Sequence, residues 1–144
     1  MERKIEIESV WEDDDLFEVK VFASNGSFSG LACCYTQREA ILEFANSLSG
    51  FPKEQTQTVN FSTGENENFS YFSFSCKCTG KSWNIVARIK VAHIVVDSAL
   101  PKKEYFSEFD LSIEPSAIDS FVSSLKSLAA SEIGSVKAIL KAKT

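Results

Sequence analysis

The feature that most constrains this fold is a two-residue alternation of apolar and polar side chains along several stretches of the chain. The clearest stretches are residues 4–9, 16–23, 69–78 and 105–114. Because successive side chains of a β-strand point to opposite faces, this alternation predicts strands with one buried face. Residues 83–96 are apolar on both faces near their end, which favours a central strand under a helix.

Turn residues separate these strands into hairpins. Asn25-Gly26 lies before a further strand at 27–35, and this dipeptide predicts a type I′ turn. A short strand is expected at 58–62, and a loop containing a proline at 97–103. Because these connections resemble hairpins, we expect the strands to form a mainly antiparallel sheet.

The first helix is predicted at residues 36–49. Thr36 and Glu39 have the spacing of a capping box at its start. Gly50 and the proline two residues later are typical of a helix end. The stripe that this helix should bury consists of Ile41, Phe44, Ala45 and Leu48.

The second helix begins near Pro115-Ser116, with either Pro115 at the first helical position or Ser116 as the cap. Its stripe consists of Ile118, Phe121, Val122, Leu125 and Leu128. Gly134 ends the pattern, and residues 135–141 are expected to form a last strand. The predicted fold class is α+β: a mainly antiparallel sheet of about seven strands with two helices packed on it, in a two-layer sandwich.

Length and charge restrict the function. A chain of 144 residues has the usual length of one domain, so we expect a single domain, 1–144. A net charge of −5 disfavours a nucleic-acid binder, which needs cationic surface. The chain begins without the apolar run of a signal peptide, and no stretch approaches ~18 apolar residues. We therefore expect a cytoplasmic protein that binds neither nucleic acid nor membrane.

Four cysteines and one histidine are the candidates for metal binding or catalysis. Adjacent Cys33 and Cys34 should diverge in a strand, and Cys76 and Cys78 share an apolar face. These positions predict four free thiols, no metal site and no cofactor. His93 shares a strand face with Asp97, but no nucleophile motif accompanies it. We expect no catalytic residues; an enzyme that uses His93 is the alternative.

Acidic side chains cluster in two loops, and they form the candidate partner-binding site: Glu12, Asp13, Asp14, Asp15, Glu65 and Glu67. The spacing does not fit a calcium loop. Either the loops are simply solvated, or they form an anionic docking surface for a basic protein. The nearby acids Glu6, Glu8 and Glu18 add to the negative charge. Basic residues gather instead near the C-terminus: Lys126, Lys137, Lys141 and Lys143.

The second helix also carries an outward row of serines: Ser120, Ser123, Ser124, Ser127 and Ser131. Lysine and glutamate are commoner on a solvated helix face. The row is either merely tolerated there or covered by a partner, and a homodimer is one way to cover it.

Three segments carry a family resemblance. They are Leu16–Val21 running into Ser24–Gly30, the helix end Leu48–Pro52, and Ile113–Val122. In this order and spacing they resemble the WapI-like bacterial immunity proteins, antidotes to wall-associated polymorphic toxins, over roughly residues 3–130. The resemblance implies a non-enzymatic cytoplasmic protein that blocks the C-terminal domain of a cognate toxin, often a nuclease. A small acidic secretion chaperone is the alternative, although such chaperones usually begin with a helix.

Overall fold

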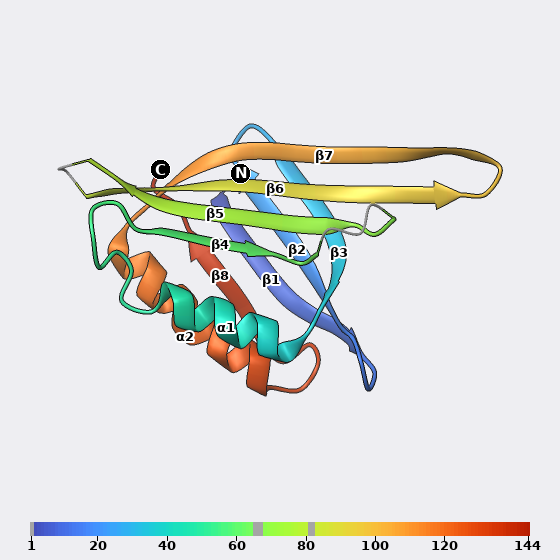
Figure 1. The fold of residues 1–144 in the computed structure, drawn as a ribbon, viewed down its shortest axis with the longest axis horizontal. Helices are drawn as coiled ribbons and strands as arrows, with labels where there is room; N and C mark the ends of the chain where they lie inside the picture. The colour runs from blue at the N-terminus through green and yellow to red at the C-terminus, as the bar shows by residue number, and fades with distance from the viewer. Residues whose placement is uncertain (1, 65–67, 81–82) are drawn as a thin grey trace.

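The computed structural model describes residues 2–64, 68–80 and 83–144. Within these ranges the chain forms eight strands and two helices (Figure 1). Their order is β1 (Arg3–Glu12), β2 (Phe17–Asn25), β3 (Ser29–Thr36), α1 (Arg38–Leu48), β4 (Thr58–Ser62), β5 (Tyr71–Thr79), β6 (Asn84–Asp97), β7 (Leu100–Ile113), α2 (Pro115–Ala130) and β8 (Lys137–Lys141).

The α+β class and the antiparallel pairing are confirmed, but the strands form two sheets rather than one. The described strands make one four-stranded sheet in the order β3-β2-β1-β8 and another in the order β4-β5-β6-β7. Each strand buries one face, and the buried side chains of both sheets belong to one connected core. Two sheets can form because the apolar face of each sheet packs against the other sheet as well as against the helices.

The sheets meet where β3 crosses β6, and they diverge towards β8 and β4 (Figure 1). Helices α1 and α2 fill this opening, with α2 against β8 and α1 against β4. At the crossing, a Cβ atom on Gly30 would lie 3.0 Å from the Cβ atom of Val91. The hydroxyl of Ser107 donates to the carbonyl of Ser29 beside it. Strand β6 is a central strand, as predicted, but β3 rather than a helix crosses it, and its apolar end at Val95 and Val96 is exposed.

Replacing Gly30 by alanine should destabilise the protein. The added methyl group overpacks the crossing, which typically costs about 1–3 kcal/mol. The lower entropy of the unfolded chain offsets roughly 0.4–1 kcal/mol of that cost. We expect urea denaturation to show a net loss, while Ser112→Ala on the exposed face of β7 leaves stability nearly unchanged. A Gly30→Ala protein as stable as the native one would contradict this close packing.

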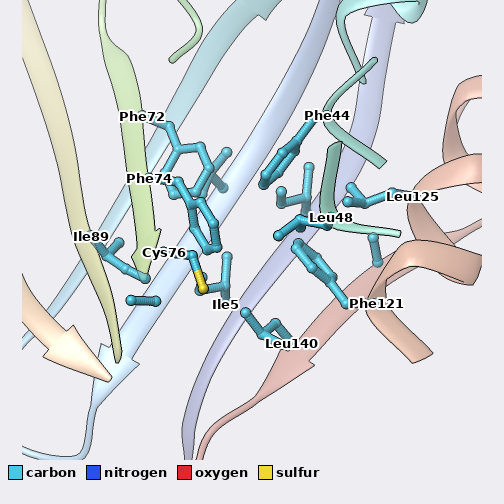
Figure 2. Close-up of a cluster of buried hydrophobic side chains, with 14 of the residues drawn as sticks. Ile5, Phe44, Leu48, Phe72, Phe74, Cys76, Ile89, Phe121, Leu125 and Leu140 are labelled. Atoms are coloured by element: carbon cyan, nitrogen blue, oxygen red, sulfur yellow. The ribbon is translucent and has the colours of Figure 1, made fainter. Parts of the chain in front are cut away.

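Aromatic rings join the two helices to each other and to the β4-β5-β6-β7 sheet in the core. The Phe44 ring of α1 stacks on Phe61 of β4 at a centroid distance of 4.3 Å. It also meets the edges of Phe74 at 5.1 Å and Phe121 at 5.9 Å. Figure 2 shows Phe44, Phe74 and Phe121 converging with Leu140 of β8 on the space between sheets and helices. Phe44 therefore contacts three other elements of the fold.

The helices agree with the predicted stripes, but the first cap differs. Thr36 ends β3 and pairs with Phe17 in the β2–β3 ladder, so its backbone belongs to the strand. Gln37 is the N-cap, without a side-chain hydrogen bond, and the predicted capping box with Glu39 is wrong. Gly50 has a φ of +73° just beyond the helix end, as expected. In α2, Pro115 occupies the first turn, which decides between the two predicted starts.

Two connections differ from prediction. The hairpin at Asn25-Gly26 is confirmed, but only Gly26 has a positive φ, so the turn is not type I′. The side chain of Asn25 instead accepts from the backbone N–H groups of Ser27 and Phe28. The expected loop at 97–103 is wrong, because β7 already begins at Leu100. The predicted last strand is confirmed as β8.

Candidate partner-binding surface

The β1–β2 connection is shorter than predicted and is shaped by one aspartate. Trp11 and Glu12 still belong to β1, which leaves residues 13–16 as the turn. The Oδ1 atom of Asp13 accepts hydrogen bonds from the N–H groups of Asp15 at 2.9 Å and Leu16 at 2.7 Å. Asp13 is therefore occupied within the turn, while the side chains of Asp14 and Asp15 are exposed.

Arg38 at the start of α1 holds this turn to the helices. Its Nε and Nη2 atoms donate to the carboxylate of Glu12 at 2.6 and 3.1 Å. Its Nη1 atom donates to the carbonyls of Ala129 at 3.0 Å and Ser131 at 2.8 Å. The guanidinium also lies 4.7 Å from the ring centroid of Phe17. These contacts connect the β1–β2 turn to the ends of both helices.

The ion pair changes the role expected of Glu12. Hydrogen bonding to Arg38 lowers the pKa of Glu12 and raises the pKa of Arg38. Because its charge is already paired, Glu12 adds little to the attraction of a basic partner. Glu12–Phe17, Gln37, Arg38 and Glu39 line a hollow of about 310 Å³. Asp14 and Asp15 are thus the acidic residues of this turn that remain available to a partner.

A second hollow, of about 590 Å³, adjoins the first and shares Leu16 and Gln37 with it. Its wall includes Tyr35 and Phe69, whose ring centroids lie 5.8 Å apart. Trp11 meets Tyr35 edge-on at 6.3 Å and extends the row. Trp11 is 43% exposed and Phe69 51% exposed. We call Trp11, Asp14, Asp15, Leu16, Tyr35 and Phe69 the acidic–aromatic surface.

Sequence reasoning placed the acidic turn in the candidate site but missed the aromatic row and Arg38. The three rings come from β1, β3 and the segment before β5, which only the folded chain brings together. The sequence contains one signal: strand alternation places Tyr35 on the face opposite Cys34. Glu65 and Glu67, the other predicted site residues, lie outside the described residues.

The expected separation of acidic and basic residues does not hold in space. Strand β8 pairs with β1, so Lys137 lies 3.2 Å from Glu6 and 4.0 Å from Glu8. Lys4 and Lys20 also pair with Glu6 and Glu8, respectively, at 2.8 Å. Glu6 and Glu8 are therefore neutralised on the outer face of their sheet and do not extend the acidic–aromatic surface.

The cysteines lie as the strand alternation predicts. Cys33 is exposed and Cys34 is buried, so the adjacent thiols face opposite sides of β3. Cys76 and Cys78 are both buried on the inner face of β5. Burial raises the pKa values of Cys34 and Cys76 to about 12. Within the described ranges, no group of three or more possible metal-ligating side chains is present.

Thiol reactivity should separate Cys33 from the other three cysteines. In the native protein we expect one thiol to react with a disulfide reagent at pH 8, because the other three are buried and inaccessible to the reagent. Denaturation without reductant should release all four, and Cys33→Ser should remove the early phase. Fewer than four thiols after denaturation, or several fast ones before it, would contradict this arrangement.

His93 lies exposed on β6, opposite Tyr105 of β7, rather than in a core. The carboxylate of Asp97 accepts from the N–H of Ala99 and so supports the β6–β7 turn. A register shift between Val95 and Asp97 interrupts the alternation that was to place Asp97 beside His93. Because His93 is exposed, His93→Ala should change the stability of the protein little.

Comparisons with known proteins add no assignment. No family model matches the chain, and no similar curated protein or solved structure was found. Among the described residues, neither helix has the length and apolar character needed to cross a bilayer.

Proposed function

We propose that this chain is a non-enzymatic immunity protein that binds a cognate toxin domain in the bacterial cytoplasm and blocks it by protein–protein contact. The observation that carries the proposal is the acidic–aromatic surface, where a hollow lined by exposed carboxylates adjoins a second hollow with an aromatic wall. The WapI-like resemblance of the sequence suggests the identity of the partner.

Each part of this surface has a use in binding a cationic protein. Aromatic side chains are enriched at protein interfaces and among the residues that dominate binding energy. Tyr35 and Phe69 supply such side chains in the wall of a hollow that can accept an anchor from the partner, and Trp11 extends the row through its contact with Tyr35. Asp14 and Asp15, which line the adjoining hollow, favour approach of a basic surface. A nuclease offers that surface, because its own substrate is a polyanion.

The local structure also limits the cost of binding. Asp13 holds the β1–β2 turn through two backbone hydrogen bonds, and Arg38 ties Glu12 to both helices. A turn that is ordered before association loses less conformational entropy when the partner arrives. This rigidity supports a recognition surface rather than a loosely solvated loop.

The proposal is tested with the purified chain and the toxin C-terminal domain from a neighbouring gene. We expect a stable complex, loss of the toxin activity in the complex, and rescue of cells that express the toxin domain. Mixing with an unrelated toxin domain is the control for specificity. Absence of a complex with the neighbouring toxin domain would rule out the proposed function.

A further inference from the structure

Strand β3 is an outer strand of its sheet, and its free edge lies beside the crossing with β6. The N–H of Asn25 donates to the carbonyl of Phe28 and closes the β2–β3 turn. Bonded and non-bonded pairs alternate from there along the ladder, so the even-numbered residues of β3 bond to β2. The N–H and C=O groups of Leu31 and Cys33 therefore point away from β2, and no described residue bonds to them. These backbone groups are available to a further strand.

This edge lacks the usual protection against strand addition. Natural outer strands carry charged residues, proline or a bulge, or they lie under a helix or loop. Residues 29–36 contain no charged residue and no proline, and the β2–β3 pairing runs without a register shift. The two ends of the edge have contacts, because Ser107 donates to the carbonyl of Ser29 and the Phe69 ring meets Tyr35. The middle of the edge has no such contact among the described residues.

Strands β6 and β7 continue beyond β3 as a two-stranded arm, residues 93–106 (Figure 1). Gly30 of β3 lies against Val91 of β6. Two residues further along the same face come His93 and its partner Tyr105, because side chains alternate along both strands. His93 is exposed, and Tyr105 is 57% exposed. The face that the rest of the sheet buries is therefore open on the arm.

The free edge and the open face are placed so that one strand can cover both. Neighbouring strands of a sheet lie ~4.8 Å apart, and two residues along a strand span ~6.6 Å. Because β3 crosses β6 and β7 obliquely (Figure 1), a strand added beside β3 would cross the arm at His93 and Tyr105. Its backbone would pair with Leu31 and Cys33 while its inner side chains cover Tyr105. We call Leu31, Cys33, His93 and Tyr105 the β3–arm corner.

We propose that an extended segment of the cognate toxin domain occupies the β3–arm corner as a fifth strand of the β3-β2-β1-β8 sheet. This inference rests on the proposed function and adds the manner of binding. The N–H and C=O groups of Leu31 and Cys33 bond to the backbone of the segment, which is the general mode of strand addition. Alternate side chains of the segment face the arm, where the exposed Tyr105 and Val95 favour apolar partners.

The place of the corner favours the toxin domain as its occupant. Tyr35 of the acidic–aromatic surface lies two residues beyond Cys33 on β3, so a partner docked on that surface reaches the free edge directly. A second copy is disfavoured, because its outer strands β3, β4 and β8 already bury their inner side chains, such as Ala32, Val59 and Leu140. A strand whose inner face is covered by its own core cannot also lie on the arm.

Amide exchange resolved by residue tests the corner in the free chain and in the complex with the toxin domain. In the free chain, the N–H groups of Leu31 and Cys33 should exchange faster than those of Ala32 and Cys34, which bond to β2. Binding should slow exchange at Leu31 and Cys33 by at least about tenfold. Slow exchange at these two residues in the free chain would mean that the edge is already covered, which would overturn the proposal.

Substitutions on the edge and on the arm add a second test. Cys33→Pro removes the outward N–H without removing a bond to β2, and outer strands tolerate proline at such positions. It should raise the dissociation constant of the toxin complex by about tenfold, through the lost hydrogen bond. Tyr105→Ala should weaken the complex by a similar factor of about ten. Phe106→Ala is the matched control, because Phe106 is 56% exposed on the opposite face of the same strand.

The outcomes separate this inference from the proposed function. A complex in which Leu31 and Cys33 exchange as in the free chain would overturn the strand addition and leave the proposed function intact. Absence of any complex would overturn both. If Cys33→Pro lowers the melting temperature, amide exchange and the comparison of Tyr105→Ala with Phe106→Ala decide, and equal effects of these two variants would contradict binding on the inner face of the arm. A free chain whose dimers Tyr105→Ala dissociates would assign the corner to a second copy instead.

Discussion

Replacing Phe44 by alanine should lower the free energy of unfolding by about 3–5 kcal/mol, the usual cost of removing a buried phenylalanine. Phe44 is 2% exposed, and its ring contacts Phe61, Phe74 and Phe121 from three other elements. Its loss removes the contacts that hold α1 in the opening between the sheets. Urea denaturation followed by circular dichroism measures the change.

Leu42→Ala is the matched control, because Leu42 lies on the same helix but is exposed. Its expected effect is below about 1 kcal/mol, since little apolar area returns to water and alanine is a good helix former. Equal losses for the two variants would mean that α1 does not pack as described.

Local patterns predicted the elements that depend on neighbouring residues. The alternation in residues 69–78 correctly placed Phe72, Phe74, Cys76 and Cys78 on the buried face of β5. The helical spacing of Ile41, Phe44, Ala45 and Leu48 likewise identified the buried stripe of α1. In both cases the period of the side chains follows from backbone geometry, so no knowledge of the remaining fold is needed.

Features that depend on distant contacts were not predictable. The same alternation suits one sheet or two, and only the crossing of β3 over β6 at Gly30 separates the sheets. Pro101 suggested a loop, but it lies near the start of β7, beside the register shift between Val95 and Asp97, where a strand tolerates the missing N–H. Thr36 had the spacing of a cap, yet its pairing with Phe17 kept it in β3.

The candidate site was predictable in part for the same reason. Consecutive Glu12–Asp15 are visible in the sequence, whereas the ring contacts of Trp11, Tyr35 and Phe69 depend on three segments that meet only in the fold. The pairing of Glu12 with Arg38 spans 26 positions and could not be read from spacing. Because of this pairing, we expect Asp14 and Asp15, rather than all four acidic residues of the segment, to contribute to docking.

Neutralising Asp14 and Asp15 together, as Asp14→Asn with Asp15→Asn, should slow association with the toxin domain by roughly tenfold at low salt. Charges at the margin of an interface act mainly on the association rate and its salt dependence. The dissociation rate should change less, because the aromatic contacts remain. Stopped-flow mixing at several salt concentrations measures both rates, and the native rate should fall more steeply with salt.

The control variant is Glu54→Gln with Asp119→Asn. It removes the same charge from exposed positions at the other end of the helices, so it separates local docking from net charge. We expect its association rate to stay close to the native value. If both double variants slow association equally, only the overall negative charge of the protein contributes.

The most direct measurement of the central claim is amide hydrogen exchange of the chain with and without its cognate toxin domain. The acidic–aromatic surface predicts that binding slows exchange in residues 11–16, 35–40 and 68–71, with little change along the outward face of α2. Protection confined to the serine row of α2, with residues 11–16 exchanging as in the free chain, would contradict it.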